Sequence, residues 1–149
     1  MRKLSVLAVA VFFGLAITAT QVFAEDNWHQ LSVSAAKSSS LGLEKLNPDI
    51  NFYMKGQSHS SVIRKFGEYK SNKRSNGFGK SAQQACDRAF ISALMSFQDR
   101  ALKEGGNAVI DIYSITKDQK FESAEEYSCL KGGFVTNVAL MGTVATIAE

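Results

Sequence analysis

One contiguous block, residues 81–112, constrains the fold more than any other part of the chain. Its first part has apolar residues at helical spacing and ends at Gly105-Gly106. The apolar segment 107–112 follows directly and has the length and composition of a strand. The block therefore predicts a helix that leads straight into a β-strand.

The helix has clear start and stop signals. Ser81, with Gln84 three residues later, forms a capping box that satisfies free N–H groups of the first turn. Gly105 supplies the left-handed cap at the other end. Small and large apolar residues share one side, and the many alanines indicate close approach to a flat partner, naturally a β-sheet. The residues on this side are Ala82, Ala85, Cys86, Ala89, Phe90, Ala93, Leu94, Phe97 and Ala101.

Four segments, including the one that follows the helix, have strand patterns. Residues 62–69 precede a dense cluster of turn formers at 71–77, which predicts a loop, and residues 108–116, 125–130 and 134–147 follow the helix. We expect an α+β fold in which one long amphipathic helix packs on an antiparallel sheet of about four strands, in the order β-α-β-β-β, with the last three forming a meander. Segment 134–147 is apolar on both sides, so its second face needs a cover, either residues 25–61 or a second subunit.

The N-terminus has the pattern of a secretory signal peptide. Arg2 and Lys3 precede the mostly apolar, uncharged segment 4–19, and small residues follow. We expect cleavage after Ala24, which places the mature protein in the periplasm or outside the cell. The alternative is an uncleaved membrane anchor, but the uncharged segment is shorter than the roughly 20 residues that span a bilayer.

The chain after cleavage has the size of one domain. Its expected organisation is a signal peptide (1–24), a weakly structured polar arm (25–61) and an α+β domain (62–149). The 17 basic residues include Arg2 and Lys3, so 15 remain against 14 acidic residues. This near balance does not call for nucleic acid or an anionic membrane as a partner.

Cys86 and Cys129 are the two cysteines. Because an exported protein meets an oxidising compartment, we predict a disulfide between them. It would close a loop of about 43 residues and stabilise the fold by roughly 4 kcal/mol. Two buried thiols are the alternative, and the sequence lacks the C-x-x-C spacing of a zinc site.

Basic residues are concentrated between Arg64 and Lys80, with Glu68 as the opposing charge. We predict a candidate anion- or partner-binding site at Lys73, Arg74, Lys80 and Ser81, because the helix start offers free N–H groups beside Lys80. The alternative is a solvated loop.

No pattern in the sequence predicts catalysis. His29 and His59 are the two histidines, and neither has the spacing of a catalytic triad or of a metal site. Glu125 and Glu126 are adjacent on an expected strand and would point to opposite faces. We therefore expect no catalytic residues, no metal site and no cofactor.

Residues 104–112 (Glu-Gly-Gly-Asn-Ala-Val-Ile-Asp-Ile) resemble the GANAV signature of the YbjQ-like domains and of the Rcs envelope stress-sensor lipoprotein. Residues 129–132 and 140–144 also resemble these families. The resemblance covers about residues 66–147 and implies the expected α+β fold. Unlike the stress sensor, the chain has no lipidated cysteine.

With its signal peptide, the whole chain looks similar to small exported bacterial proteins often described as excinuclease ATPase subunits. The sequence does not support that activity. A phosphate-binding P-loop needs a glycine where this chain has Arg74, and paired C-x-x-C zinc ligands are lacking.

Taken together, these features favour binding over catalysis. The resemblance implies a periplasmic interaction module, related to envelope stress, that presents its basic segment to a protein or to an anionic envelope component. The alternative is a homo-oligomeric protein of the YbjQ-like kind that binds a small ligand or a metal.

Overall fold

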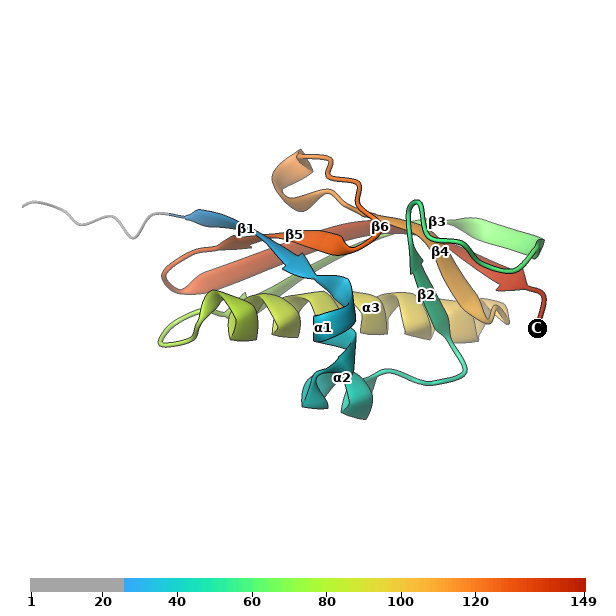
Figure 1. Ribbon diagram of the computed structural model, residues 1–149, viewed down its shortest axis with the longest axis horizontal. Coiled ribbons are helices and arrows are strands. Elements are labelled where there is room, and N and C mark those ends of the chain that lie inside the picture. The colour runs from blue at the N-terminus through green and yellow to red at the C-terminus, as the bar shows by residue number, and fades with distance from the viewer. Residues whose placement is uncertain (1–25) are drawn as a thin grey trace, which may run out of the picture.

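The computed structural model describes residues 26–149, and its fold belongs to the α+β class expected from the sequence (Figure 1). The predicted signal peptide and its cleavage site lie outside the described residues. One long helix, α3 (Ala82–Glu104), lies under a mixed six-stranded sheet. Two short helices, α1 (Val33–Ser38) and α2 (Ser40–Lys45), lie on the same side of the sheet as α3.

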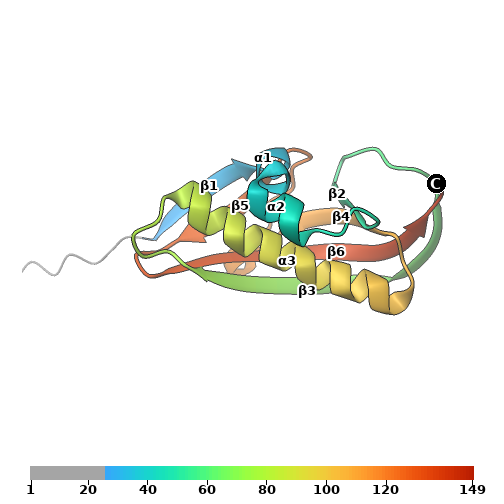
Figure 2. The same ribbon diagram turned by 90° about the horizontal axis from the view of Figure 1, so that it is seen from below.

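Strand β6 (Val135–Ile147) organises the sheet. Along one edge it pairs over its whole length with β3 (Val62–Asn76), antiparallel. Along the other edge it pairs first with β5 (Glu126–Lys131) and then with β4 (Ala108–Ser114), so β5 and β4 lie end to end (Figure 2). Strand β1 (Asn27–Ser32) extends the sheet beyond β5, and β2 (Asn51–Met54) extends it beyond β4.

The expected four-stranded antiparallel meander is therefore wrong in detail. The sheet has six strands, and β2 runs parallel to β4. β4 and β5 do not pair with each other, because the chain leaves the sheet after Ser114, forms a short 3-10 helix η1 (Thr116–Asp118) and crosses the face opposite α3.

Residues 27–54 also differ from the weakly structured arm expected from the sequence. They contain β1, α1, α2 and β2, and they belong to the same sheet and core as the rest of the chain. Ser32 and Ser39 are the N-cap residues of the two short helices. Their side chains accept hydrogen bonds from the N–H groups of Ala35 and Gly42. The strands form because distant partners, β5 and β4, supply the hydrogen bonds of the ladder.

The loop predicted at 71–77 is strand up to Asn76. Its turn-forming residues are held extended by pairing with β6, and the Asn137 side chain adds hydrogen bonds to Asn72 and to the backbone oxygen of Lys73. Tertiary pairing here overrides local turn propensity.

The core lies between α3 and the sheet. Ala85, Ala89, Ala93 and Ala101 on α3 are fully buried, as the alanine pattern predicted. Gly142 of β6 permits this close approach, because a Cβ atom there would lie 2.9 Å from Val109 Cγ1 and 3.2 Å from Phe97 Cε2.

The opposite face of β6 is covered in part by residues 115–125 and in part by Tyr53, which lies within the segment 25–61. Thr116 is fully buried, and its hydroxyl donates to the Ser128 oxygen and accepts from the Ala139 N–H group. Towards the end of β6, Ala108, Ile110, Ala145 and Ile147 form a second small cluster. Other segments of the same chain thus cover part of the second face of β6.

Candidate binding site at the start of the long helix

The start of α3 is fixed by the capping box that the sequence predicted. The Ser81 hydroxyl accepts a hydrogen bond from the Gln84 N–H group at 3.2 Å, and the Gln84 side-chain oxygen accepts one from the Ser81 N–H group at 3.4 Å. Extended backbone at Ser81 turns into helix at Ala82. Lys80 immediately precedes this cap.

A hollow of about 290 Å³ lies between this helix start and α2. We call it the α3-start hollow. Its residues come from two segments that are about forty positions apart in the sequence. They are Ser39, Ser40, Leu41, Lys80, Gln84, Asp87 and Arg88.

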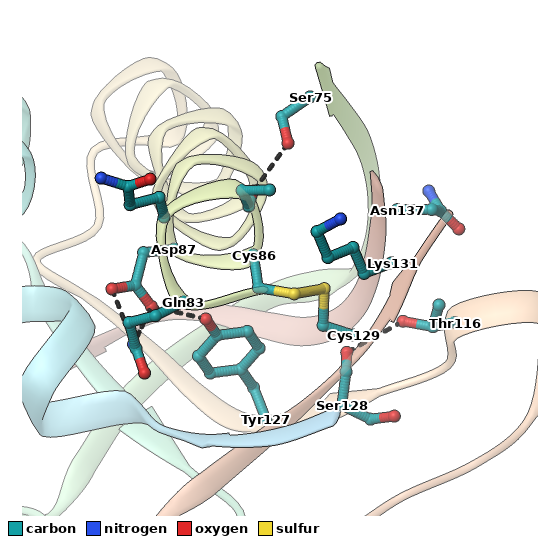
Figure 3. Close-up of a disulfide and its surroundings, with 12 residues drawn as sticks. Ser75, Gln83, Cys86, Asp87, Thr116, Tyr127, Ser128, Cys129, Lys131 and Asn137 are labelled. Atoms are coloured by element: carbon teal, nitrogen blue, oxygen red, sulfur yellow. Dashed lines mark hydrogen bonds between the residues drawn. A yellow bond between two sulfur atoms is a disulfide. The ribbon is translucent and has the colours of Figure 1, made fainter. Parts of the chain in front are cut away.

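The one carboxylate of the hollow is already engaged. Asp87 Oδ1 accepts a 2.6 Å hydrogen bond from the Tyr127 hydroxyl, and the Gln83 side-chain amide donates to both Asp87 oxygens at 2.8 Å (Figure 3). Burial, and next the hydrogen bond to Asp87, raises the pKa of Tyr127, so the phenol remains a donor.

Two cations of the hollow are left without a carboxylate partner. Among residues 26–149, neither Lys80 nor Arg88 forms an ion pair. They stand beside the positive end of the α3 dipole. Ser40 adds a hydroxyl group to the same space, whereas the Ser39 hydroxyl already donates to the Ala36 oxygen at 2.7 Å and accepts from the Gly42 N–H group. Because two cations and a serine hydroxyl group line the hollow, it can accommodate an anionic group such as phosphate or carboxylate.

A disulfide fixes the part of α3 that lines the hollow. The predicted bond between Cys86 and Cys129 is present, with a Cα–Cα distance of 5.9 Å, and both residues are fully buried. One turn along α3, Phe90 stacks on Tyr127 with ring centroids 4.0 Å apart. The first turns of α3 are thus tied to β5 covalently and through side-chain packing (Figure 3).

The structure separates the four basic-site residues predicted from the sequence. Lys80 lines the α3-start hollow, and Ser81 caps the helix beside it. Lys73 and Arg74 lie instead on β3, opposite Val138 and Asn137 of β6. Adjacent strand residues point to opposite faces, so Lys73 and Arg74 do not share a surface.

Sequence reasoning missed Arg88 and the serine residues of α2. Arg88 lies four residues after Gln84 on α3, and this helical spacing was a usable signal. The sequence contains no such signal for Ser39 and Ser40, because their place at the hollow depends on how α2 packs.

A second hollow of about 390 Å³ lies on the face opposite α3. It is lined by Trp28, Gln30, Gln119, Lys120, Phe121 and Ser128. The cation of this hollow is already paired: Lys120 contacts Glu122 and lies 4.9 Å from the centre of the Tyr113 ring.

The histidines lie apart. His29 is on β1 opposite Cys129, and His59 packs against Tyr53 with ring centroids 5.4 Å apart. Within residues 26–149, no group of three or more His, Cys, Asp and Glu side chains has a metal-binding arrangement. In the same residues, no helix has the length and apolar character needed to cross a bilayer.

Comparison with known proteins finds no match to this chain, either among protein-family models or among curated proteins.

Proposed function

We propose that this protein is an exported, non-enzymatic binding module that recognises the phosphate or carboxylate group of a partner at the α3-start hollow. The observation that carries the proposal is the pair of cations, Lys80 and Arg88, that share the hollow with the Ser40 hydroxyl group and have no carboxylate partner in residues 26–149. Export to the periplasm and cleavage after Ala24 are part of the proposal. The disulfide supports an oxidising location.

The rigidity of the surrounding structure favours binding. The capping box, the disulfide and the hydrogen bond between Tyr127 and Asp87 hold the lining residues in place before any ligand arrives. Such preorganisation reduces the entropy lost on binding. We relate the module to the envelope, as the resemblance to the stress-sensor fold implies.

The direct test is a titration with inorganic phosphate and with citrate, followed through backbone amide chemical shifts. We expect the shifts to concentrate at residues 39–41 and 80–88, and to disappear in the Lys80→Ser/Arg88→Ser variant. Lys103→Ser, at the other end of α3, is the matched control and should leave them unchanged. An unchanged spectrum at millimolar anion, or equal shifts in both variants, would refute the proposal.

The alternative proposal is a homo-oligomeric protein of the YbjQ-like kind that binds a small ligand or a metal. One structural feature favours a second copy: β3 has fifteen residues and pairs on one side only in residues 26–149. Native mass spectrometry of protein from the periplasm separates the two proposals. A ring with bound metal supports the alternative, and a monomer supports the binding module.

A further inference from the structure

Two exposed phenylalanine rings lie at the end of the molecule where α3 begins. Phe78, in the turn between β3 and α3, stacks on Phe134, in the turn between β5 and β6, with ring centroids 5.5 Å apart and planes 3° from parallel. Their exposed fractions are 66% and 70%. Val135 beside them is also exposed. We call this surface, residues 77–79 and 132–135, the aromatic tip.

The backbone holds these rings in place. The Gly77 N–H group donates to the Phe134 oxygen at 2.8 Å, which joins the two turns. The Phe78 N–H group donates to the Asn76 side-chain oxygen at 2.9 Å. A Cβ atom on Gly77 would lie 2.7 Å from Thr136 Oγ1, so the first turn lies directly against the second. Both rings are therefore presented to solvent by fixed turns.

The charge around the aromatic tip is positive. Lys131 lies at the second turn, where its amine donates to the Gly132 oxygen at 3.5 Å. The end of β3 that leads into the first turn adds Lys73 and Arg74, which lie on opposite faces of the strand, and residues 73–81 and 131–135 contain no carboxylate. Asp26 is the acidic residue nearby, because a Cβ atom on Gly132 would lie 2.6 Å from its Oδ1 atom. The net charge of this group of residues is positive.

The described chain also begins at this end. β1 starts beside the turn between β5 and β6, in both views of the molecule (Figures 1 and 2).

We propose that the aromatic tip inserts into the interface of an anionic phospholipid bilayer. Exposed apolar rings flanked by lysine and arginine are the combination that binds such an interface, because the rings enter the acyl boundary while the cations meet the lipid phosphates. The fixed turns let both rings enter together. This inference rests on the tip and does not depend on anion binding in the α3-start hollow.

Vesicle flotation tests the inference. Residues 26–149 contain the whole described core, so the chain from residue 25 onward is mixed with vesicles of phosphatidylethanolamine and phosphatidylglycerol, or of phosphatidylcholine alone. We expect binding to the anionic vesicles, weakened by salt. Phe78→Ala/Phe134→Ala should reduce the partition coefficient about tenfold or more. Arg74→Ser/Lys131→Ser should reduce it about fivefold per cation, and both residues lie outside the α3-start hollow.

Ile63→Ala is the matched control. Ile63 is 69% exposed on β3 near the opposite end of the molecule, and this variant should bind as the unmodified chain does. Circular dichroism and thermal unfolding confirm that each variant is folded. Phe134→Trp keeps an aromatic ring at the tip, and its emission should shift to shorter wavelength on anionic vesicles.

Three results would overturn the inference: no binding to anionic vesicles, an equal loss in Ile63→Ala, or a dimer in solution that Phe78→Ala/Phe134→Ala dissociates. The last result would assign the aromatic tip to a second copy of the chain. Anion shifts at the α3-start hollow without vesicle binding would sink this inference alone and leave the proposed function standing.

Discussion

Tyr127 of β5 donates a 2.6 Å hydrogen bond to Asp87 of α3, across the layer boundary between helix and sheet. Tyr127 is fully buried, and its ring stacks on Phe90. The bond lies one residue from Cys86 on the helix and two residues from Cys129 on the strand. The hydrogen bond and the disulfide therefore join α3 to β5 at the same place.

The first prediction concerns this hydrogen bond. Tyr127→Phe keeps the stacked ring but removes the hydroxyl group, and we expect it to lower the free energy of unfolding by about 1.5–3 kcal/mol, the range for bonds to charged groups. Urea denaturation measures the change. Tyr53→Phe is the control and should stay within about 0.5 kcal/mol, since Tyr53 is partly exposed. Equal effects of the two substitutions would contradict the prediction.

The second prediction concerns alkaline pH. The pKa of Tyr127 is raised in the folded protein, so above about pH 10 the unfolded chain loses the tyrosine proton while the folded chain keeps it. Stability is therefore complete below pH 10 and falls above it, by up to about 1.4 kcal/mol per pH unit from this group. Brief denaturation measurements at pH 9 to 11 should show a shallower decline in Tyr127→Phe, and parallel curves would refute the assignment.

The third prediction concerns the disulfide. Cys86→Ala/Cys129→Ala should lower the free energy of unfolding by about 2–5 kcal/mol, because the cross-link restricts the unfolded chain. Guanidinium denaturation measures the loss. The reduced unmodified protein should match the double variant closely. An unchanged midpoint in either sample would show that the bond contributes little.

The fourth prediction concerns the start of α3. Ser81→Ala removes the acceptor for the Gln84 N–H group and should cost about 1 kcal/mol. Ser92→Ala is a matched control within the same helix, where the hydroxyl group bonds only the Arg88 backbone oxygen, and it should change stability by less than about 0.5 kcal/mol. A larger loss in the control than in Ser81→Ala would contradict the role of the cap.

The fifth prediction concerns the close approach of α3 to the sheet. Gly142→Ala places a methyl group within 3.2 Å of Phe97 and should cost about 1–3 kcal/mol through overpacking. The same substitution in a Phe97→Leu background should cost less, because the smaller side chain leaves room. A double-mutant cycle with no coupling between the two positions would argue against direct contact.

Features of the fold that depend on residues close together in the sequence could be predicted from it. The capping box at Ser81 and Gln84, the left-handed Gly105 at the helix end and the buried alanine face all depend on one helix. The disulfide followed from the number of cysteines and the expected compartment. These predictions needed no knowledge of the sheet.

The remaining features depend on partners far away in the chain. Residues 71–76 carry turn formers and yet form strand, because β6 pairs with them, and β1 exists because β5 lies beside it. At the candidate site, Lys80 and Ser81 lie together at the helix start, as their adjacency in the sequence predicted. Arg74 was wrongly grouped with them, because a strand in place of the loop turned its side chain to the other face.

The end-to-end placement of β5 and β4 along β6 has a consequence for local unfolding. β5 is joined to β6 by two residue pairs, Leu130 with Asn137 and Lys131 with Thr136. The two-stranded ribbon of β1 and β5 is therefore held to α3, through the disulfide and the contacts of Tyr127, as well as to its neighbour in the sheet. In a reducing environment this ribbon would open as a subglobal unit, and its amide hydrogens would exchange with solvent before those of the β3–β6 pair.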